Sequence, residues 1–134
     1  MPGLTLAEAR TLLDAGLAEA DAIGQPMNVA VVDAGGHLLA FARQDGAIRA
    51  SIDIAQRKAV TSILMEASTV DLMPLVQPGA ELYGLEQTAG GMVVFGGGVP
   101  VRRDGELIGA VGVSAGSVEQ DVRVAEAAVA AIKS

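Results

Sequence analysis

Two glycine-containing turns, each between two short runs of strand-forming residues, limit the possible folds of this chain more than any other feature. The first turn is Ala34-Gly35-Gly36 and the second is Asp104-Gly105. The first turn joins residues 27–33 to residues 37–43, and the second joins residues 99–102 to residues 107–114. Glycine tolerates the positive φ angles of tight turns, so each pair of runs predicts an antiparallel hairpin.

Three stretches with apolar residues at helical spacing accompany the hairpins. They cover residues 5–23, residues 48–65 and the segment from Ser117 onward. The first and last begin with capping-box patterns, which pair Thr5 with Glu8 and Ser117 with Gln120. The stripe expected to be buried in the second helix consists of Ile48, Ile52, Ala55, Ala59 and Ile63.

The segment between the second helix and the second hairpin is less regular. Prolines and a glycine prevent one long helix over residues 66–90, so we expect a short helix near 69–76 and then a loop. The run GMVVF at residues 91–95 predicts one more strand. The whole order predicts a single α+β domain over residues 1–134, with helices packed on an antiparallel sheet of about five strands.

Charge and residue content exclude several classes of function. A net charge of −7 repels nucleic acid, and only 2 phenylalanines and 1 tyrosine are present to stack on bases. No apolar run is long enough to span a bilayer. The absence of cysteine excludes thiolate chemistry, and the first residues lack a secretory pattern, so we expect a cytoplasmic protein. The 17 glycines and the alanine-rich helices allow close contact between copies, so we expect a homo-oligomer.

Residues 112–116 (GVSAG) match the G-x-S-x-G pattern of a nucleophile elbow, and they lie between a predicted strand and a predicted helix. That mechanism needs a base for the serine, usually a histidine that follows it in the chain. No histidine follows Ser114. We therefore interpret the pattern as a strand-to-helix turn built from small residues.

Gly96-Gly97-Gly98 is a second glycine-rich motif. It lacks the lysine and the following helix of a phosphate-binding loop. We interpret it as a bend between strands. The alternative interpretation is that the bare backbone of Gly96 and Gly97 lies against a flat ligand.

His37 is the only histidine of the chain, and it directly follows the first turn. One imidazole cannot build an ordinary metal site, but it suffices as an axial ligand of haem. Strand alternation predicts that His37, Leu39, Phe41 and Arg43 share one face. His37 and Arg43 are roughly 20 Å apart along a strand, so they could contact opposite ends of a large planar anion, with Arg43 pairing a carboxylate such as a haem propionate.

Lys58 lies in the second predicted helix. The favoured interpretation is a surface lysine whose aliphatic stem covers apolar neighbours. The alternative is a partly buried lysine of lowered pKa that acts as a base or as a group that binds an electrophile.

Several segments together resemble the GlcG/HbpS family of small haem-binding or haem-degrading proteins. They are VVDAGGHLLAFARQDGA at residues 31–47, Ser51-Ile52, Lys58-Ala59, and GGGVPVRRDGELIGAVGVSAGSVEQD at residues 96–121. A similar module forms the C-terminal part of some propanediol-utilisation corrinoid adenosyltransferases. The resemblance covers nearly the whole chain. It implies a profilin-like fold with a five-stranded antiparallel sheet, higher oligomers and, in some members, haem bound through a histidine.

The leading hypothesis is therefore an oligomeric cytoplasmic protein that binds haem or a related planar tetrapyrrole. His37 is the predicted axial ligand of the iron, Arg43 the propionate partner and Phe41 a further cofactor contact. Lys58 adds positive charge near the pocket, and Gly96-Gly97 supplies bare backbone for the flat ligand.

Two other functions stay open. One is a small isomerase, hydratase or lyase that acts on an unsaturated carboxylate, with His37 exchanging a proton and Lys58 or Arg43 holding the carboxylate. Because His37 and Arg43 are far apart on one strand, Lys58 is the preferred partner in that arrangement. The other is a non-catalytic assembly module whose apolar surfaces only join copies of the chain.

Overall fold

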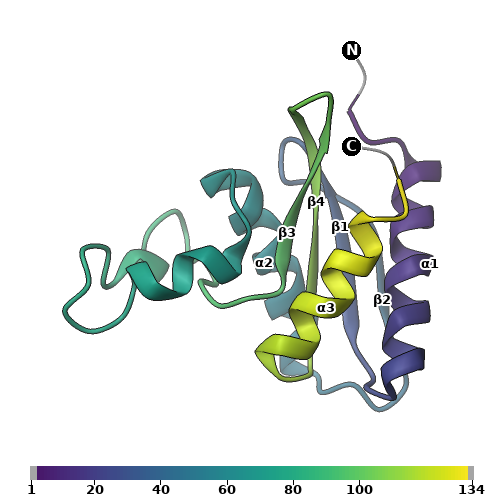
Figure 1. Cartoon of the computed structure of the whole chain (residues 1–134), viewed down its shortest axis with the longest axis horizontal. Coiled ribbons are helices and arrows are strands. Elements are labelled where there is room, and N and C mark those ends of the chain that lie inside the picture. The colour runs from purple at the N-terminus through teal and green to yellow at the C-terminus, as the bar shows by residue number, and fades with distance from the viewer. Residues whose placement is uncertain (1–2, 133–134) are drawn as a thin grey trace.

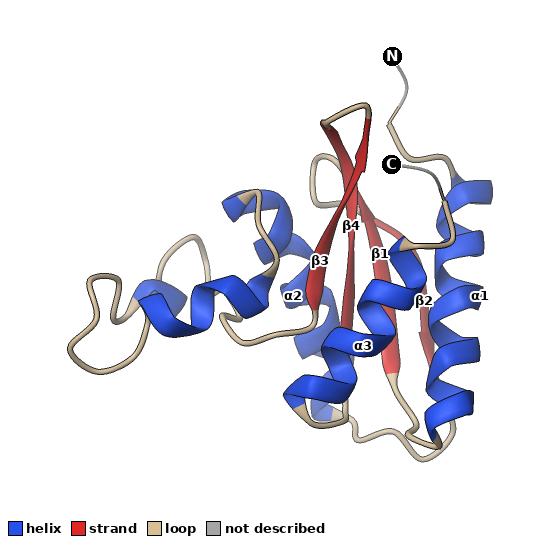
Figure 2. Cartoon of the chain, viewed as in Figure 1, coloured by secondary structure: helices blue, strands red, loops and turns tan. Residues whose placement is uncertain are grey.

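A computed structural model describes residues 3–132 as three layers, with one sheet between helices (Figures 1 and 2). The sheet has the order β2-β1-β4-β3, and all its pairs are antiparallel. Its strands are β1 (Asn28–Asp33), β2 (Leu38–Arg43), β3 (Gly98–Arg103) and β4 (Glu106–Ser114). The helices are α1 (Leu6–Ile23), α2 (Ala50–Met65) and α3 (Val118–Val129). Helices α1 and α3 lie side by side on one face, and α2 covers the other. The predicted α+β fold is confirmed, while residues 1–2 and 133–134 of the predicted domain lie outside the described residues.

The helix ends follow local signals in the sequence. Thr5 accepts a hydrogen bond from the backbone N–H of Glu8, and Ser117 accepts one from Gln120, so both predicted capping boxes are present. Helix α2 starts two residues later than predicted and has no side-chain cap. Ile48 therefore precedes the helix and is 59% exposed, so the prediction that it is buried was wrong.

The described residues form four strands rather than about five, because residues 91–95 do not join the sheet. Met92 and Val94 are buried instead in a small cluster with Leu72 of the 3-10 helix η1 (Thr69–Leu75). The backbone N–H of Val93 donates to the Thr61 hydroxyl of α2 at 3.1 Å, in place of a strand partner. This segment and η2 (Leu85–Gln87) belong to an arm that projects from the side of the sandwich (Figure 1).

A β-bulge changes which residues of β2 share a face. Val31 pairs with Ala40, but Val32 pairs with Leu38. Leu39 is therefore an extra residue, and it packs into the core under α1 and α3. Leu38 shares the opposite face with Phe41 and Arg43, so the predicted alternation was wrong at Leu39. His37 lies before the bulge, outside β2, and simple alternation no longer places it with Phe41.

Both faces of the sheet carry apolar cores. The larger core includes Leu12 of α1, Val124 of α3 and the sheet residues Val31 and Val111. The smaller core joins Val32 and Ala110 of the sheet to residues of α2. Gly112 lets α2 approach β4 closely, because a Cβ atom there would lie 1.9 Å from the carbonyl oxygen of Ala55. No helix of the described residues is long and apolar enough to cross a membrane.

Candidate functional site

His37 lies at the end of the β1–β2 turn, and its side chain is 83% exposed. Its Nδ1 atom is 3.4 Å from Oδ1 of Asp33, the last residue of β1. The same carboxylate oxygen accepts hydrogen bonds from the backbone N–H groups of Gly35 and His37, both at 2.9 Å. The turn is thus built around one carboxylate that also faces the imidazole.

The hydrogen bonds within the turn keep Asp33 ionised. The backbone N–H groups of His37 and Gly35 lower the pKa of the Asp33 carboxyl, with partial burial acting in the opposite direction. The nearby imidazole of His37 lowers this pKa further. A carboxylate at neutral pH therefore faces Nδ1, while the exposed ring leaves its Nε2 side open to solvent.

Next to His37, one face of the edge strand β2 is left uncovered. Helix α2 packs on β1, β4 and β3 rather than on β2. Leu38, Phe41 and Arg43 point to this side, and we call these three residues the β2 face. Leu38 is 50% exposed, Phe41 is half-buried and Arg43 is exposed. The β2 face is an apolar surface with a cation at one end and His37 beyond the other.

The Arg43 end of the β2 face lies beside the start of α2. Asn28, the cross-strand partner of Arg43, donates from Nδ2 to the backbone oxygen of Ile48 at 3.2 Å. Helix α2 has no side-chain cap, and the N–H groups of Ser51 and Ile52 donate to the backbone oxygens of Ile48 and Arg49 instead. The guanidinium of Arg43 is therefore the group that favours a negatively charged partner at this place.

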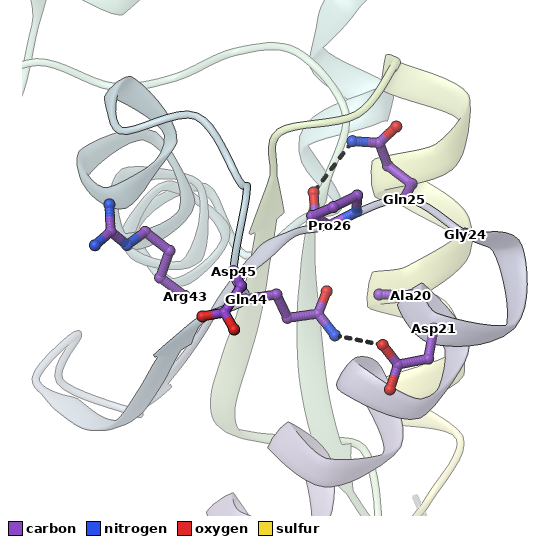
Figure 3. Close-up of a pocket in the computed structure, with 8 residues that line it drawn as sticks. All are labelled: Ala20, Asp21, Gly24, Gln25, Pro26, Arg43, Gln44 and Asp45. Atoms are coloured by element: carbon purple, nitrogen blue, oxygen red, sulfur yellow. Dashed lines mark hydrogen bonds between the residues drawn. The ribbon is translucent and has the colours of Figure 1, made fainter.

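A surface cavity of about 560 Å³ lies on another side of Arg43 (Figure 3). It is lined by Ala20, Asp21, Gly24, Gln25, Pro26, Arg43, Gln44 and Asp45. Its polar groups bond to one another, since Gln44 Nε2 donates to Asp21 Oδ1 at 3.0 Å and Gln25 Nε2 to the oxygen of Pro26 at 3.1 Å. Figure 3 shows the guanidinium of Arg43 directed away from Asp21 and Gln44. The bond from Gln44 links α1 to the residue that follows β2, and the bond from Gln25 stays within the segment after α1.

Lys58 is fully buried, so the interpretation as a surface lysine was wrong. Its Nζ atom donates to Asp121 Oδ2 at 2.9 Å and to the carbonyl oxygen of Val113 at 2.8 Å. The ring of Phe95 covers the ammonium, with 4.8 Å between Nζ and the ring centroid. Lys58 thus joins α2 to β4, to α3 and to the segment before β3.

Burial disfavours the charged forms of Lys58 and Asp121. The opposite charge of each residue shifts the pKa of the other back in favour of the charged form. Burial lowers the pKa of Lys58, and the charge of Asp121 raises it. Burial raises the pKa of Asp121, and the charge of Lys58 lowers it. Asp121 also accepts a hydrogen bond from the backbone N–H of Gly116 at 3.0 Å. These hydrogen bonds, together with the Phe95 ring, make a buried ion pair of this kind tolerable.

Gly96 and Gly97 are buried beside this ion pair. A Cβ atom on Gly97 would lie 2.7 Å from Lys58 Nζ, and one on Gly96 would lie 2.7 Å from a methyl group of Val122. The bare backbone here faces the side chains of α2 and α3. The structure therefore brings Gly97 and Lys58 together, in the interior and away from His37.

His37 and Lys58 lie near different positions along β4. Gly109 of this strand pairs with Asp33, and Val113, four residues further on, contacts Lys58 through its carbonyl oxygen. These four steps span roughly 13 Å. The arrangement expected for a small lyase or isomerase, with His37 and Lys58 on one carboxylate substrate, is not formed in this conformation.

The G-x-S-x-G segment is a packing site. Ser114 is buried, and its hydroxyl donates to Ser51 Oγ of α2 at 3.0 Å. The backbone N–H of Gly116 donates a hydrogen bond to the side chain of Asp121 in α3. The interpretation as a strand-to-helix turn is confirmed.

Two carboxylates that shape these sites were absent from the residues named by sequence reasoning. Asp33 was placed only at the end of the predicted strand over residues 27–33, although its spacing of four residues from His37 across two glycines was a visible signal. Asp121, the partner of Lys58, is 63 residues away in the chain, and only the fold brings the two together.

Comparisons with known proteins agree with this architecture. A family model described as "Haem degrading protein HbpS-like" matches residues 4–130. A 15.0 kDa protein of the dhaT-dhaS intergenic region of Citrobacter freundii is 46% identical over 126 residues, which cover 93% of this chain and 89% of that protein.

Two further comparisons involve corrinoid adenosyltransferases. The enzyme PduO of Salmonella typhimurium is 43% identical over 130 residues, which cover 96% of this chain but only 39% of that enzyme. The crystal structure of a PduOC:heme complex superimposes with a TM-score of 0.92 and 42% identity, and covers 97% of this chain and 95% of that one. The similarity to the enzyme is thus confined to a module of well under half its length.

Proposed function

Because the chain belongs to the HbpS-like family of haem degrading proteins, we propose that it binds haem or a related planar tetrapyrrole. The observation that carries the proposal is the environment of His37. Its imidazole is exposed, its Nδ1 faces an ionised carboxylate, and it lies at the end of an uncovered apolar face. A histidine that binds a metal usually donates its second ring N–H to a carboxylate or a carbonyl, and Asp33 places a carboxylate oxygen 3.4 Å from Nδ1.

The residues present fit a haem group. His37 offers a free Nε2 atom to the iron, and one axial ligand suffices when the porphyrin supplies the other four. Leu38 and Phe41 offer apolar surface to the macrocycle, and Arg43 offers a guanidinium to a propionate. When bound, haem would supply the redox and oxygen chemistry of its iron. The residues of the chain would bind and orient it.

Lys58, Gly96 and Gly97 have a different place in the proposal. They lie inside the protein. We therefore propose that they stabilise the segment before β3 and do not contact the cofactor directly. In that role, the ion pair of Lys58 holds α2 in place. The first turn of α2, which lies beside Arg43, is thereby held in place as well.

We further propose that the single domain of residues 1–134 acts in the cytoplasm as a homo-oligomer and binds no nucleic acid. A single copy leaves haem on the β2 face open to water, and a second copy would cover it. Large apolar side chains that stay exposed support such contacts. They are Leu6, Leu38, Ile48, Leu64, Leu75, Tyr83 and Phe95.

A haem titration followed by absorbance tests the proposal. We expect the Soret band to shift and sharpen on binding to the natural chain. His37→Ala should give a different band and a Kd at least about tenfold higher, because the axial bond is lost.

Arg43→Ala tests the other end of the β2 face. It should raise the Kd by roughly fivefold, since an exposed ion pair contributes at most about 1 kcal/mol. Arg10→Ala, an exposed arginine of α1, is the matched control and should bind as the natural chain does. Identical spectra and affinities for all variants would reject the site.

A further inference from the structure

We infer that Asp33 and Gly35 are positioning residues of the haem site, which hold the His37 imidazole with its proton on Nδ1 and thereby present Nε2 to the iron. The inference rests on the proposed function, because it concerns the same histidine. It gives a chemical reason for the order Asp-x-Gly-Gly-His in the first turn.

Asp33 acts on the imidazole through a carboxylate that is already fixed in place. Two backbone N–H groups bind its Oδ1 atom, those of Gly35 and His37. The main chain closes the turn as well, since the N–H of Asp33 donates to the oxygen of His37 at 2.9 Å and the N–H of Gly36 donates to the oxygen of Asp33 at 2.9 Å. The carboxylate therefore cannot turn away from Nδ1, which lies 3.4 Å from it.

Gly35 leaves the space in which the imidazole lies back over the turn. A Cβ atom on Gly35 would lie 2.9 Å from Nδ1 and 3.0 Å from Cε1 of His37. Such contacts are too short, so any larger residue would push the ring away from Asp33. The φ angle of Gly35 is outside the left-handed region, unlike that of Gly36 at 83°. Gly35 is thus required by the position of the ring and not by the backbone of the turn.

The chemical consequence follows from the two tautomers of neutral imidazole. One ring nitrogen carries the proton and donates, and the other has the lone pair that binds a metal. An anionic carboxylate beside Nδ1 favours the proton there, because proton and carboxylate attract. Nε2 then keeps its lone pair, and the exposed ring leaves it accessible from solvent.

The test uses 15N NMR of the ring nitrogens in the protein without haem. His37 is the only histidine, so its ring signals are assigned without ambiguity. At a pH where the ring signals are those of a neutral imidazole, we expect the Nδ1–H tautomer to predominate. Asp33→Asn keeps an acceptor for the two N–H groups but removes the charge, and Gly35→Ala keeps the Asp33 carboxylate but displaces the ring. Both variants should shift the population toward the Nε2–H tautomer.

Two variants serve as matched controls. Asp104→Asn removes a carboxylate from the second hairpin turn, and Gly3→Ala adds a methyl group where the nearest atom is 3.6 Å away. Neither should change the tautomer. A natural chain with mainly Nε2–H, or variants that leave the tautomer unchanged, would overturn the inference.

Haem affinity separates this inference from the proposed function. We expect Asp33→Asn and Gly35→Ala to raise the Kd for haem about tenfold, as is usual for residues that orient a metal ligand. Full affinity in both variants, while His37→Ala loses binding, would overturn the positioning role alone. Full affinity in His37→Ala would instead overturn the assignment of His37 as ligand, whatever the tautomer data show.

Discussion

Replacing Lys58 by methionine tests the account of the protein interior. Methionine keeps most of the volume of the lysine stem but removes the ammonium. The change leaves Asp121, whose side chain is 3% exposed, without its charged partner, and it also leaves the oxygen of Val113 unpaired. Breaking a buried ion pair from one side costs about 3–5 kcal/mol. We therefore expect Lys58→Met to lower the free energy of unfolding by about that amount at pH 7.

The pH dependence of this loss has a definite sign. The pKa of Asp121 is raised in the folded protein, and removing Lys58 removes a charge that lowers it. The folded variant thus binds the Asp121 proton more tightly than its unfolded chain does, so acidification favours the folded state. The deficit against the natural chain should narrow as the pH falls from about 7 toward about 5.

Urea unfolding followed by far-UV circular dichroism measures these differences. The double variant Lys58→Met with Asp121→Asn should recover more than half of the loss, because it removes the buried charge and keeps an acceptor for Gly116. Arg57→Met, next to Lys58, removes an ion pair with Asp53 and hydrogen bonds to Gly90 and Gly91 that are all exposed, so it should cost only about 1 kcal/mol. A Lys58→Met loss as small as that of Arg57→Met, or no recovery in the double variant, would refute the reasoning.

Two further predictions concern packing and helix ends. Gly112→Ala should prevent stable folding, because its Cβ would lie 1.9 Å from the carbonyl oxygen of Ala55. Ser114→Ala should lower the free energy of unfolding by only about 1 kcal/mol, because one hydrogen bond is lost. Thermal unfolding of both variants checks these expectations. Ser117→Ala should lower stability by about 1 kcal/mol through loss of the α3 cap, and Ser117→Asp should restore it; an alanine variant as stable as the natural chain would contradict the capping assignment.

Sequence reasoning succeeded wherever the determining interactions are local. The capping box that starts at Thr5 involves residues within one helical turn, and the hairpin turn at Asp104-Gly105 involves direct neighbours. Such patterns act regardless of what packs on them. This is why the helices, both hairpins and the α+β class could be predicted.

Sequence reasoning failed where contacts between residues far apart in the chain determine the structure. The run at residues 91–95 has the composition of a strand. However, the backbone N–H of Val93 donates to Thr61 of α2, and the side chains of Met92 and Val94 are buried in the arm. The extra residue Leu39 interrupts the alternation of β2 at a position that no local pattern marks. Lys58 looks like a surface residue because its partner Asp121 lies in another helix.

The candidate site shows the same division. His37 was identified because it is the only imidazole of the chain, and Arg43 because it ends the same strand. The role of Gly35 could not be predicted, since it depends on where the imidazole lies and not on the turn. The uncovered state of the β2 face likewise follows from the position of α2 over β1, β4 and β3.

The most direct test of the central claim is whether a histidine nitrogen binds the haem iron. Because His37 is the only histidine, labelling the protein with 15N-histidine marks this one side chain. Electron–nuclear double resonance of the haem complex should then show strong coupling of the iron spin to a 15N nucleus, and His37→Ala should abolish it. A haem complex of the natural chain without that coupling would contradict the account.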